Sequence, residues 1–115
     1  MRALPGFKLI SALSPFAKIN DFREIQNFNL YRSGSTFLLN LGLSACLDNR
    51  NMQIEIICEG ISSCRLQLPG HALESFHIEC ISDRGWENKN WELLDYESDC
   101  FHAYAKSVEI IKAHF

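Results

Sequence analysis

The chain has 115 residues, of which 47% are hydrophobic and 11% aromatic. This length accommodates a single domain with one core (residues 1–115), and the composition is that of a folding protein rather than a disordered one. A formal net charge of −3 argues against a nucleic-acid partner, which normally requires a basic excess. No apolar run approaches the roughly 20 residues of a membrane helix, so we expect no membrane partner either.

The first 20 residues are the hardest to interpret. Leu9, Ile10 and Leu13 recur at helical spacing before Pro15, which predicts one or two helical turns near residues 6–14. An irregular lid or an edge strand fits the same residues. Pro5, Gly6 and Lys8 interrupt the apolar character, so we do not expect a signal peptide here.

From about Phe28 onward, hydrophobic residues recur at every second position. A run with Ile25, Phe28 and Leu30 is followed by Ser33-Gly34-Ser35 and then by Thr36 to Leu43. Successive side chains of a strand point to opposite faces, so each run offers one apolar face. Glycine between two such runs predicts a hairpin.

The alternation resumes after a polar turn at residues 47–51. Met52 to Glu59 is predicted to be a strand, Gly60 interrupts it, and residues 61–68 continue as a second hairpin arm or as one long bent strand. Further strands are predicted at 76–81, 91–96, 101–105 and 108–111, with a bulge at Lys106-Ser107 where the phase slips.

Seven or eight short strands with turns between them predict an all-β, mainly antiparallel fold. We expect a single-domain β-sandwich or a partly closed barrel, preceded by a short N-terminal helix or irregular segment. Successive strands leave no room for crossover helices, which excludes a parallel βαβ arrangement.

Five cysteines are present, an odd number without any C-x-x-C pair. Cys58, Cys64 and Cys80 occupy the apolar positions of predicted strands, where a free thiol behaves as a small hydrophobic group. A secreted disulfide scaffold would normally be shorter and evenly paired. We therefore expect reduced thiols in a cytoplasmic protein.

Motifs for metal binding or catalysis are weak. Cys100 and His102 are two residues apart, but the usual zinc spacings are missing, and we interpret them as a core thiol beside a surface imidazole. Asp95, Glu97 and Asp99 alternate and could pair with Glu87 or Glu92 as in a glycosidase, although an acidic edge or an acidic docking patch explains them better. We predict no cofactor, no metal ion and no catalytic residues.

The acidic residues and both tryptophans are concentrated in one segment. Residues 83–99 hold six acids and two bases, a net charge of −4, which leaves the remainder of the chain at +1. Trp91 begins a predicted strand and should plug the core, whereas Trp86 follows Gly85 in a loop and should be exposed. An exposed tryptophan among acids is typical of a binding hot spot for a basic protein, and a sugar-stacking platform would use the same residues. The predicted partner-binding residues are Asp83, Trp86, Glu87, Asp95, Glu97 and Asp99.

Several segments together resemble a group of small bacterial β-rich proteins, some of them immunity proteins of polymorphic toxin systems (the Imm50-like type). They are the hairpin at 33–39, the step from Ile54-Glu55-Ile56 to Glu59-Gly60-Ile61, the stretch 81–87 with Asp83-Arg84-Gly85-Trp86-Glu87, and the closing strand through 108–110. The resemblance implies neutralisation of a toxin by binding and carries no catalytic residues.

Three functions remain open from the sequence. The first is a cytoplasmic protein that binds another protein, such as a basic toxin, through its acidic and aromatic surface. The second is a carbohydrate- or ligand-binding module that stacks a ligand on Trp86 and Trp91. The third is a subunit that self-associates through an exposed edge strand.

Overall fold

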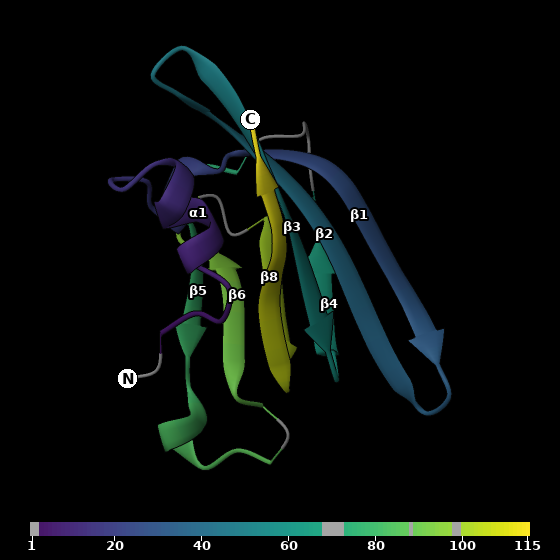
Figure 1. Ribbon diagram of the computed structural model, residues 1–115. Coiled ribbons are helices and arrows are strands. Elements are labelled where there is room, and N and C mark those ends of the chain that lie inside the picture. Colours follow the sequence, from purple (N-terminus) through teal and green to yellow (C-terminus); the bar gives the residue numbers. More distant parts are fainter. Residues whose placement is uncertain (1–2, 68–72, 88, 98–99) are drawn as a thin grey trace.

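The computed structural model describes residues 3–67, 73–87, 89–97 and 100–115 (Figure 1). Within these ranges the chain forms eight strands in two antiparallel four-stranded sheets that pack face to face. The first sheet has the order β1-β2-β3-β8 and the second β4-β7-β6-β5. The all-β prediction is confirmed, as a sandwich rather than a closed barrel. No helix among the described residues is long and apolar enough to cross a membrane.

The elements follow the predicted order along the chain. The strands are β1 (Glu24–Ser33), β2 (Thr36–Leu47), β3 (Arg50–Glu59), β4 (Ser62–Leu66), β5 (Phe76–Cys80), β6 (Trp91–Asp95), β7 (Phe101–Ala105) and β8 (Ser107–His114). The helical elements are α1 (Lys8–Leu13) and the short 3₁₀ turns η1 (Ile19–Asp21) and η2 (Ser82–Arg84). Helix α1 confirms the turns predicted near residues 6–14.

Two tight hairpins build most of the first sheet. Ser33 pairs with Thr36 across Gly34-Ser35, which confirms the predicted hairpin. The next connection, Asp48-Asn49, has positive φ angles of 52° and 63°. Asp and Asn tolerate this conformation better than other non-glycine residues, and two successive positive φ angles match the right-handed twist of the flanking strands.

The two sheets share one bent ribbon. β3 pairs with β8 in the first sheet, and their continuations β4 and β7 pair in the second. The bend lies at Gly60 on one strand and Lys106 on the other, and the Lys106 N–H donates to the Glu59 carbonyl at 2.9 Å. Gly60 has φ +67°, and a Cβ there would lie 2.7 Å from the Lys106 Cβ. The phase slip predicted as a bulge at Lys106-Ser107 is therefore the point where the chain changes sheets.

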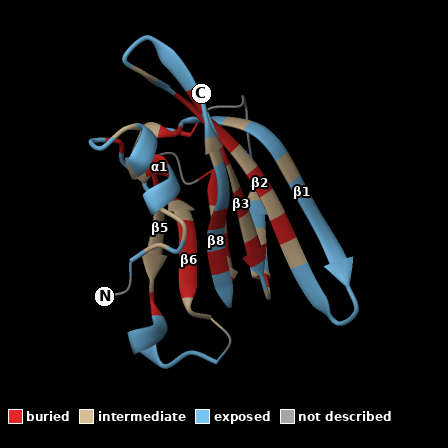
Figure 2. Ribbon diagram, in the orientation of Figure 1, coloured by how far each residue is buried: buried red, intermediate tan, exposed pale blue. Residues whose placement is uncertain are grey.

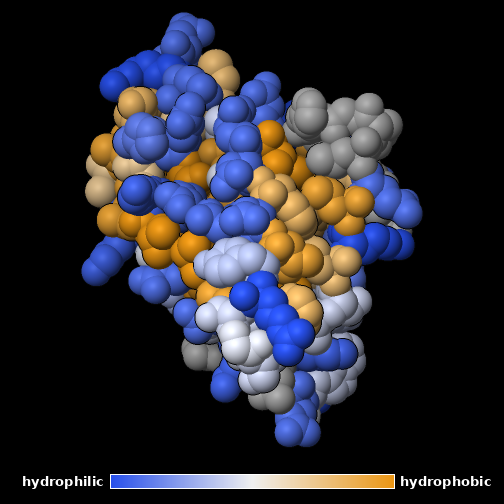
Figure 3. All heavy atoms as spheres, turned by 90° about the vertical axis from the view of Figure 1, so that its right-hand side faces the viewer, coloured by the Kyte–Doolittle hydropathy of each residue, from blue (hydrophilic) through white to orange (hydrophobic). Residues whose placement is uncertain are grey.

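The two edges of the first sheet differ. The β8 edge is covered by the N-terminal segment, since the Ile110 N–H donates to the Pro5 carbonyl at 3.0 Å and α1 packs beside it. β1 pairs only with β2 among the described residues. The tip of the β1–β2 hairpin is exposed (Figure 2), and the view onto the β1 side shows hydrophobic residues beside polar ones (Figure 3). The sandwich thus keeps one long uncovered edge.

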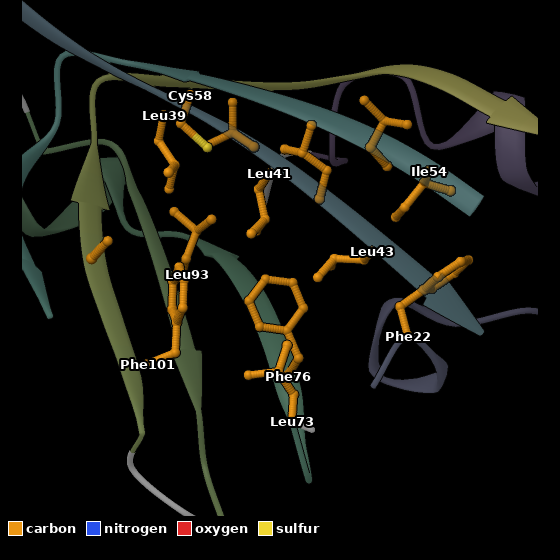
Figure 4. Packing of buried hydrophobic residues seen from close by; sticks show 14 of the residues in the cluster. Phe22, Leu39, Leu41, Leu43, Ile54, Cys58, Leu73, Phe76, Leu93 and Phe101 are labelled. Carbon is orange, nitrogen blue, oxygen red and sulfur yellow. The ribbon is translucent and has the colours of Figure 1, made fainter. Parts of the chain in front are cut away.

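Alternating residues of both sheets fill the core (Figure 4). Leu39, Leu41 and Leu43 of β2 are fully buried, as the two-residue period predicts. Phe37 continues their face but is 47% exposed, because this end of β2 lies at the exposed hairpin tip. Trp91 is buried, which confirms its predicted role in the core.

Candidate functional site

The loop between β5 and β6 holds Trp86 at one end of the second sheet. Ile81 N–H donates to the Asn90 carbonyl at 2.8 Å, and Asn90 N–H donates to the Ala105 carbonyl at 3.0 Å. Within the loop, η2 ends at Gly85, whose φ of +70° is a left-handed conformation that glycine adopts at little cost. This turn presents Trp86 to solvent with its side chain 44% exposed, as the sequence predicts.

Trp86 lies against Tyr104 of β7. The two rings meet edge to face, with centroids 5.8 Å apart. Two cations lie over the Trp86 ring, the Arg84 guanidinium at 5.3 Å and the Lys89 ammonium at 5.7 Å, and Lys89 also lies 4.9 Å from the Tyr104 ring. Aromatic and cation–π contacts therefore hold the indole in place although nearly half of it is open to solvent.

Glu92 lies beneath these aromatic side chains on the outer face of β6, opposite Tyr104 in the sheet register. It is only 9% exposed. Its carboxylate lies 2.8 Å from His102 Nε2 and 3.7 Å from Arg84 Nη1. Desolvation raises the pKa of the Tyr104 hydroxyl, and the neighbouring Glu92 carboxylate raises it further. We call Arg84, Trp86, Lys89, Glu92, His102 and Tyr104 the Trp86 cluster.

A second aromatic contact lies on the same outer face and extends to Glu79, which is opposite Glu92 in the pairing of β5 with β6. The Tyr96 hydroxyl donates a hydrogen bond to the Glu79 carboxylate, which is the main reason why its pKa is raised to about 12. His77 packs edge to face on the Tyr96 ring, with centroids 4.6 Å apart. The outer face of the second sheet is thus rich in aromatic side chains with polar partners.

The six predicted partner-binding residues do not form one surface. Asp83, Trp86 and Glu87 lie together and exposed in the β5–β6 loop. Glu97 is also exposed, but it lies beyond the end of β6 that is opposite the β5–β6 loop. The five residues of β6 separate the two ends of the strand by about 16 Å. Asp99 lies outside the described residues. The acidic segment therefore does not present a single acidic patch.

Asp95 corrects the sequence prediction most clearly. Its side chain is 2% exposed and points to the core side of β6, opposite Phe76. The carboxylate accepts backbone N–H groups from Glu74 at 2.7 Å, Ser75 at 3.0 Å and Glu97 at 3.1 Å. A partner cannot reach this group, because it closes the turns at one end of the sheet.

The side chains considered for metal binding or for a carboxylate pair contact different groups and do not meet. The Cys100 thiol donates to Asp95 at 3.6 Å, whereas His102 contacts Glu92. Glu92 and Asp95 lie on opposite faces of β6, so they do not form a carboxylate pair. Within the described part of the chain, no three His, Cys, Asp or Glu side chains are arranged to hold a metal ion.

Three open hollows of about 360 to 390 Å³ lie elsewhere on the surface. One borders the start of β1 and the end of β2, one borders the bend of the ribbon, and one follows α1. The Trp86 cluster lines none of these three.

Sequence reasoning missed Glu92, His102 and Tyr104 as parts of the site. His102 and Tyr104 do show the two-residue spacing of one strand face, but their meeting with Glu92 depends on the pairing of β6 with β7. Comparison of the chain with protein-family models, with curated proteins and with solved structures found no match.

Proposed function

We propose that this protein is a non-catalytic binding protein that docks a protein partner on the outer face of its second sheet, with Trp86 as the anchor. The observation that carries the proposal is a tryptophan 44% exposed yet held by Tyr104, Arg84 and Lys89. Binding hot spots are enriched in Trp, Tyr and Arg, and a pre-positioned side chain loses little entropy on docking.

The bonding of Glu92 favours a structural role for this carboxylate. His102 and Arg84 lie at its two oxygens, and Tyr104 lies directly opposite it on β7. A carboxylate held in this way positions the surrounding aromatic and cationic side chains. Its removal would disturb the surface without removing a reactive group.

Charge around Trp86 favours a basic partner. Asp83 and Glu87 are exposed on either side of it. Arg84 lies near Glu92, and Lys89 lies over the two rings, so both cations are already in contact with groups of the protein. A positively charged partner would gain favourable contacts with the two outer carboxylates, and a nucleic-acid-cleaving toxin is the specific partner that we propose. Five free thiols suit a reducing cytoplasm.

The test compares two exposed aromatic residues on different parts of the surface. Proteins retained from the native host by immobilised wild type, Trp86→Ala and Phe16→Ala would be identified, and the retained partner would be purified for calorimetry. Phe16 is 92% exposed and follows α1, so it is a matched control. We expect Trp86→Ala to lose about 2 kcal/mol or more of binding energy and Phe16→Ala to bind as wild type. Equal retention by both variants would refute the proposed anchor.

The charge component has a separate test with the same purified partner. Asp83→Asn with Glu87→Gln should slow association and reduce its dependence on salt, because attraction between opposite charges acts mainly on the encounter rate. An unchanged association rate at low salt would exclude a basic partner surface at this position.

A carbohydrate ligand is the second candidate, favoured by the partly exposed indole beside hydrogen-bonding side chains. Arg84 and Lys89 over the ring would compete with a stacked sugar. Trp91 is buried and contributes no second stacking surface. A change in tryptophan emission during a glycan titration, lost in Trp86→Ala, would favour this candidate over a protein partner.

A further inference from the structure

Among the residues that the structure describes, β1 pairs only with β2, and its other edge is suited to a second copy of the same chain. It is a ten-residue strand, whereas the edge strands of the second sheet, β4 and β5, have five residues each. Residues 29–37 are all exposed. Residues 27–33 contain no acid, no lysine and no proline, which often protect an edge, and Arg32 is the one charged residue among them.

The hairpin register determines which backbone groups are free. Ser33 and Thr36 close a two-residue turn, and such a closing pair exchanges both of its hydrogen bonds. Bonded pairs then alternate along the ladder, so Tyr31, Asn29 and Asn27 also bond to β2. The N–H and C=O groups of Phe28, Leu30 and Arg32 therefore point away from β2, toward the open edge.

Only one two-fold register uses all three of these residues. Antiparallel pairing centred on Leu30 places Leu30 opposite its own copy and Phe28 opposite the Arg32 of the second chain. Each of the three resulting pairs exchanges two hydrogen bonds. A shift by two residues leaves one of the three residues without a partner. The irregularity between Ile25 and Asn27 ends the regular ladder just before this segment.

Side chains fit the same register. Phe28 and Leu30 pair with Leu41 and Leu39 of β2, so they lie on the core side of the sheet. Leu30 is 42% exposed in the single chain and would be covered by its copy. Arg32, whose Nε donates to the Gly34 carbonyl of its own hairpin at 2.8 Å, would lie opposite Phe28 of the second chain and not opposite another arginine, so no like charges meet across the axis.

We propose that two copies of this chain pair antiparallel through β1, about a two-fold axis at Leu30. The two first sheets then form one continuous eight-stranded sheet, since each contributes four strands. Trp86 belongs to the loop after β5, the opposite edge strand from β4 in the second sheet. The proposal is therefore independent of the proposed function.

The first experiment measures molecular mass by sedimentation equilibrium from about 1 to 200 µM, a range that covers micromolar dissociation constants. Wild type should change from monomer to dimer with concentration. Leu30→Lys should weaken the dimer about tenfold or more, because two like charges would meet at the axis. Tyr31→Lys is the matched control: Tyr31 is 40% exposed but its backbone bonds to β2, so this variant should dimerise as wild type does.

The second experiment uses the wild type alone and does not depend on the folding of a variant. Amide hydrogen exchange is followed by NMR at the two ends of the same concentration range. The amides of residues 28, 30 and 32 should exchange more slowly at high concentration, while those of 29 and 31 should be protected at both. The proposal would be overturned by a wild type that is monomeric at all concentrations, or by equal weakening of the dimer in both lysine variants. It would also be overturned if amide exchange at residues 28, 30 and 32 did not depend on concentration.

Discussion

Replacement of Asp95 by asparagine should destabilise the fold, although it changes one atom of an acidic residue. The side chain is buried, and its two oxygens accept three backbone N–H groups. An amide keeps the size but offers only one acceptor oxygen and adds a donor.

The magnitude follows from the geometry. Ser75 and Glu97 both donate to Oδ1, while the Glu74 N–H at 2.7 Å and the more weakly donating Cys100 thiol at 3.6 Å donate to Oδ2. The best placement of asparagine keeps its oxygen at the Oδ1 position and turns its NH₂ group toward the Glu74 N–H. The hydrogen bond of the Glu74 N–H to a charged group, worth about 1.5–3 kcal/mol, is then lost, and leaving this buried N–H unpaired costs about 1–3 kcal/mol. We expect a loss of about 3–5 kcal/mol, a large share of the roughly 5–15 kcal/mol that stabilises a domain.

Urea unfolding followed by tryptophan fluorescence measures this loss, because buried Trp91 reports on the core. Glu97→Gln is the matched control, since Glu97 is exposed and its side chain should contribute less than about 0.5 kcal/mol. A loss below about 1 kcal/mol for Asp95→Asn would refute this structural role.

Three more predictions concern single side chains. Gly60→Ala should lower the free energy of unfolding by about 2–4 kcal/mol, because φ at this position is +67° and the added Cβ would collide with Lys106. Gly85→Ala has a similar φ of +70° but open space around the Cβ, so it should lower the free energy of unfolding by only about 1 kcal/mol. Similar urea midpoints for the two variants would contradict this. Burial raises the pKa of Cys58 to about 12, so in the native protein at pH 8 a thiol reagent should modify exposed Cys46 and spare Cys58, as peptide mass spectrometry would show. The hydrogen bond to Glu79 raises the pKa of Tyr96 to about 12. This bond should therefore stabilise the fold fully below the unfolded pKa of about 10, and its contribution should decline as the pH rises toward 12. The difference in unfolding free energy between wild type and Tyr96→Phe should shrink over that range, and a constant difference would exclude the bond.

Local patterns were sufficient to predict most strands. The two-residue period marked the buried face of β2 at Leu39, Leu41 and Leu43, and glycine between two such runs marked the first hairpin. These signals are local because strand geometry fixes which side chains share a face. Helix α1 was predicted by the same reasoning with a helical period.

Features that depend on long-range pairing could not be predicted. The acids of segment 83–99 look alike in sequence, yet Asp95 is buried on one face of β6 while Glu92 lies on the other beside His102. The register of β6 against β7 decides this, and it pairs residues that are eight to fourteen positions apart in the sequence. The phase slip at Lys106 was visible, but only the pairing of β7 and β8 with different sheets shows that it is a crossing.

The shared ribbon has a consequence for how the domain comes apart. Because β3 continues as β4 and β7 continues as β8, a shift of the strand register by two residues in one sheet would require the same shift in the other sheet. Separate melting of either layer would leave half of each long strand without its ladder. We therefore expect the two layers to unfold as one cooperative unit, with no intermediate that retains a single sheet.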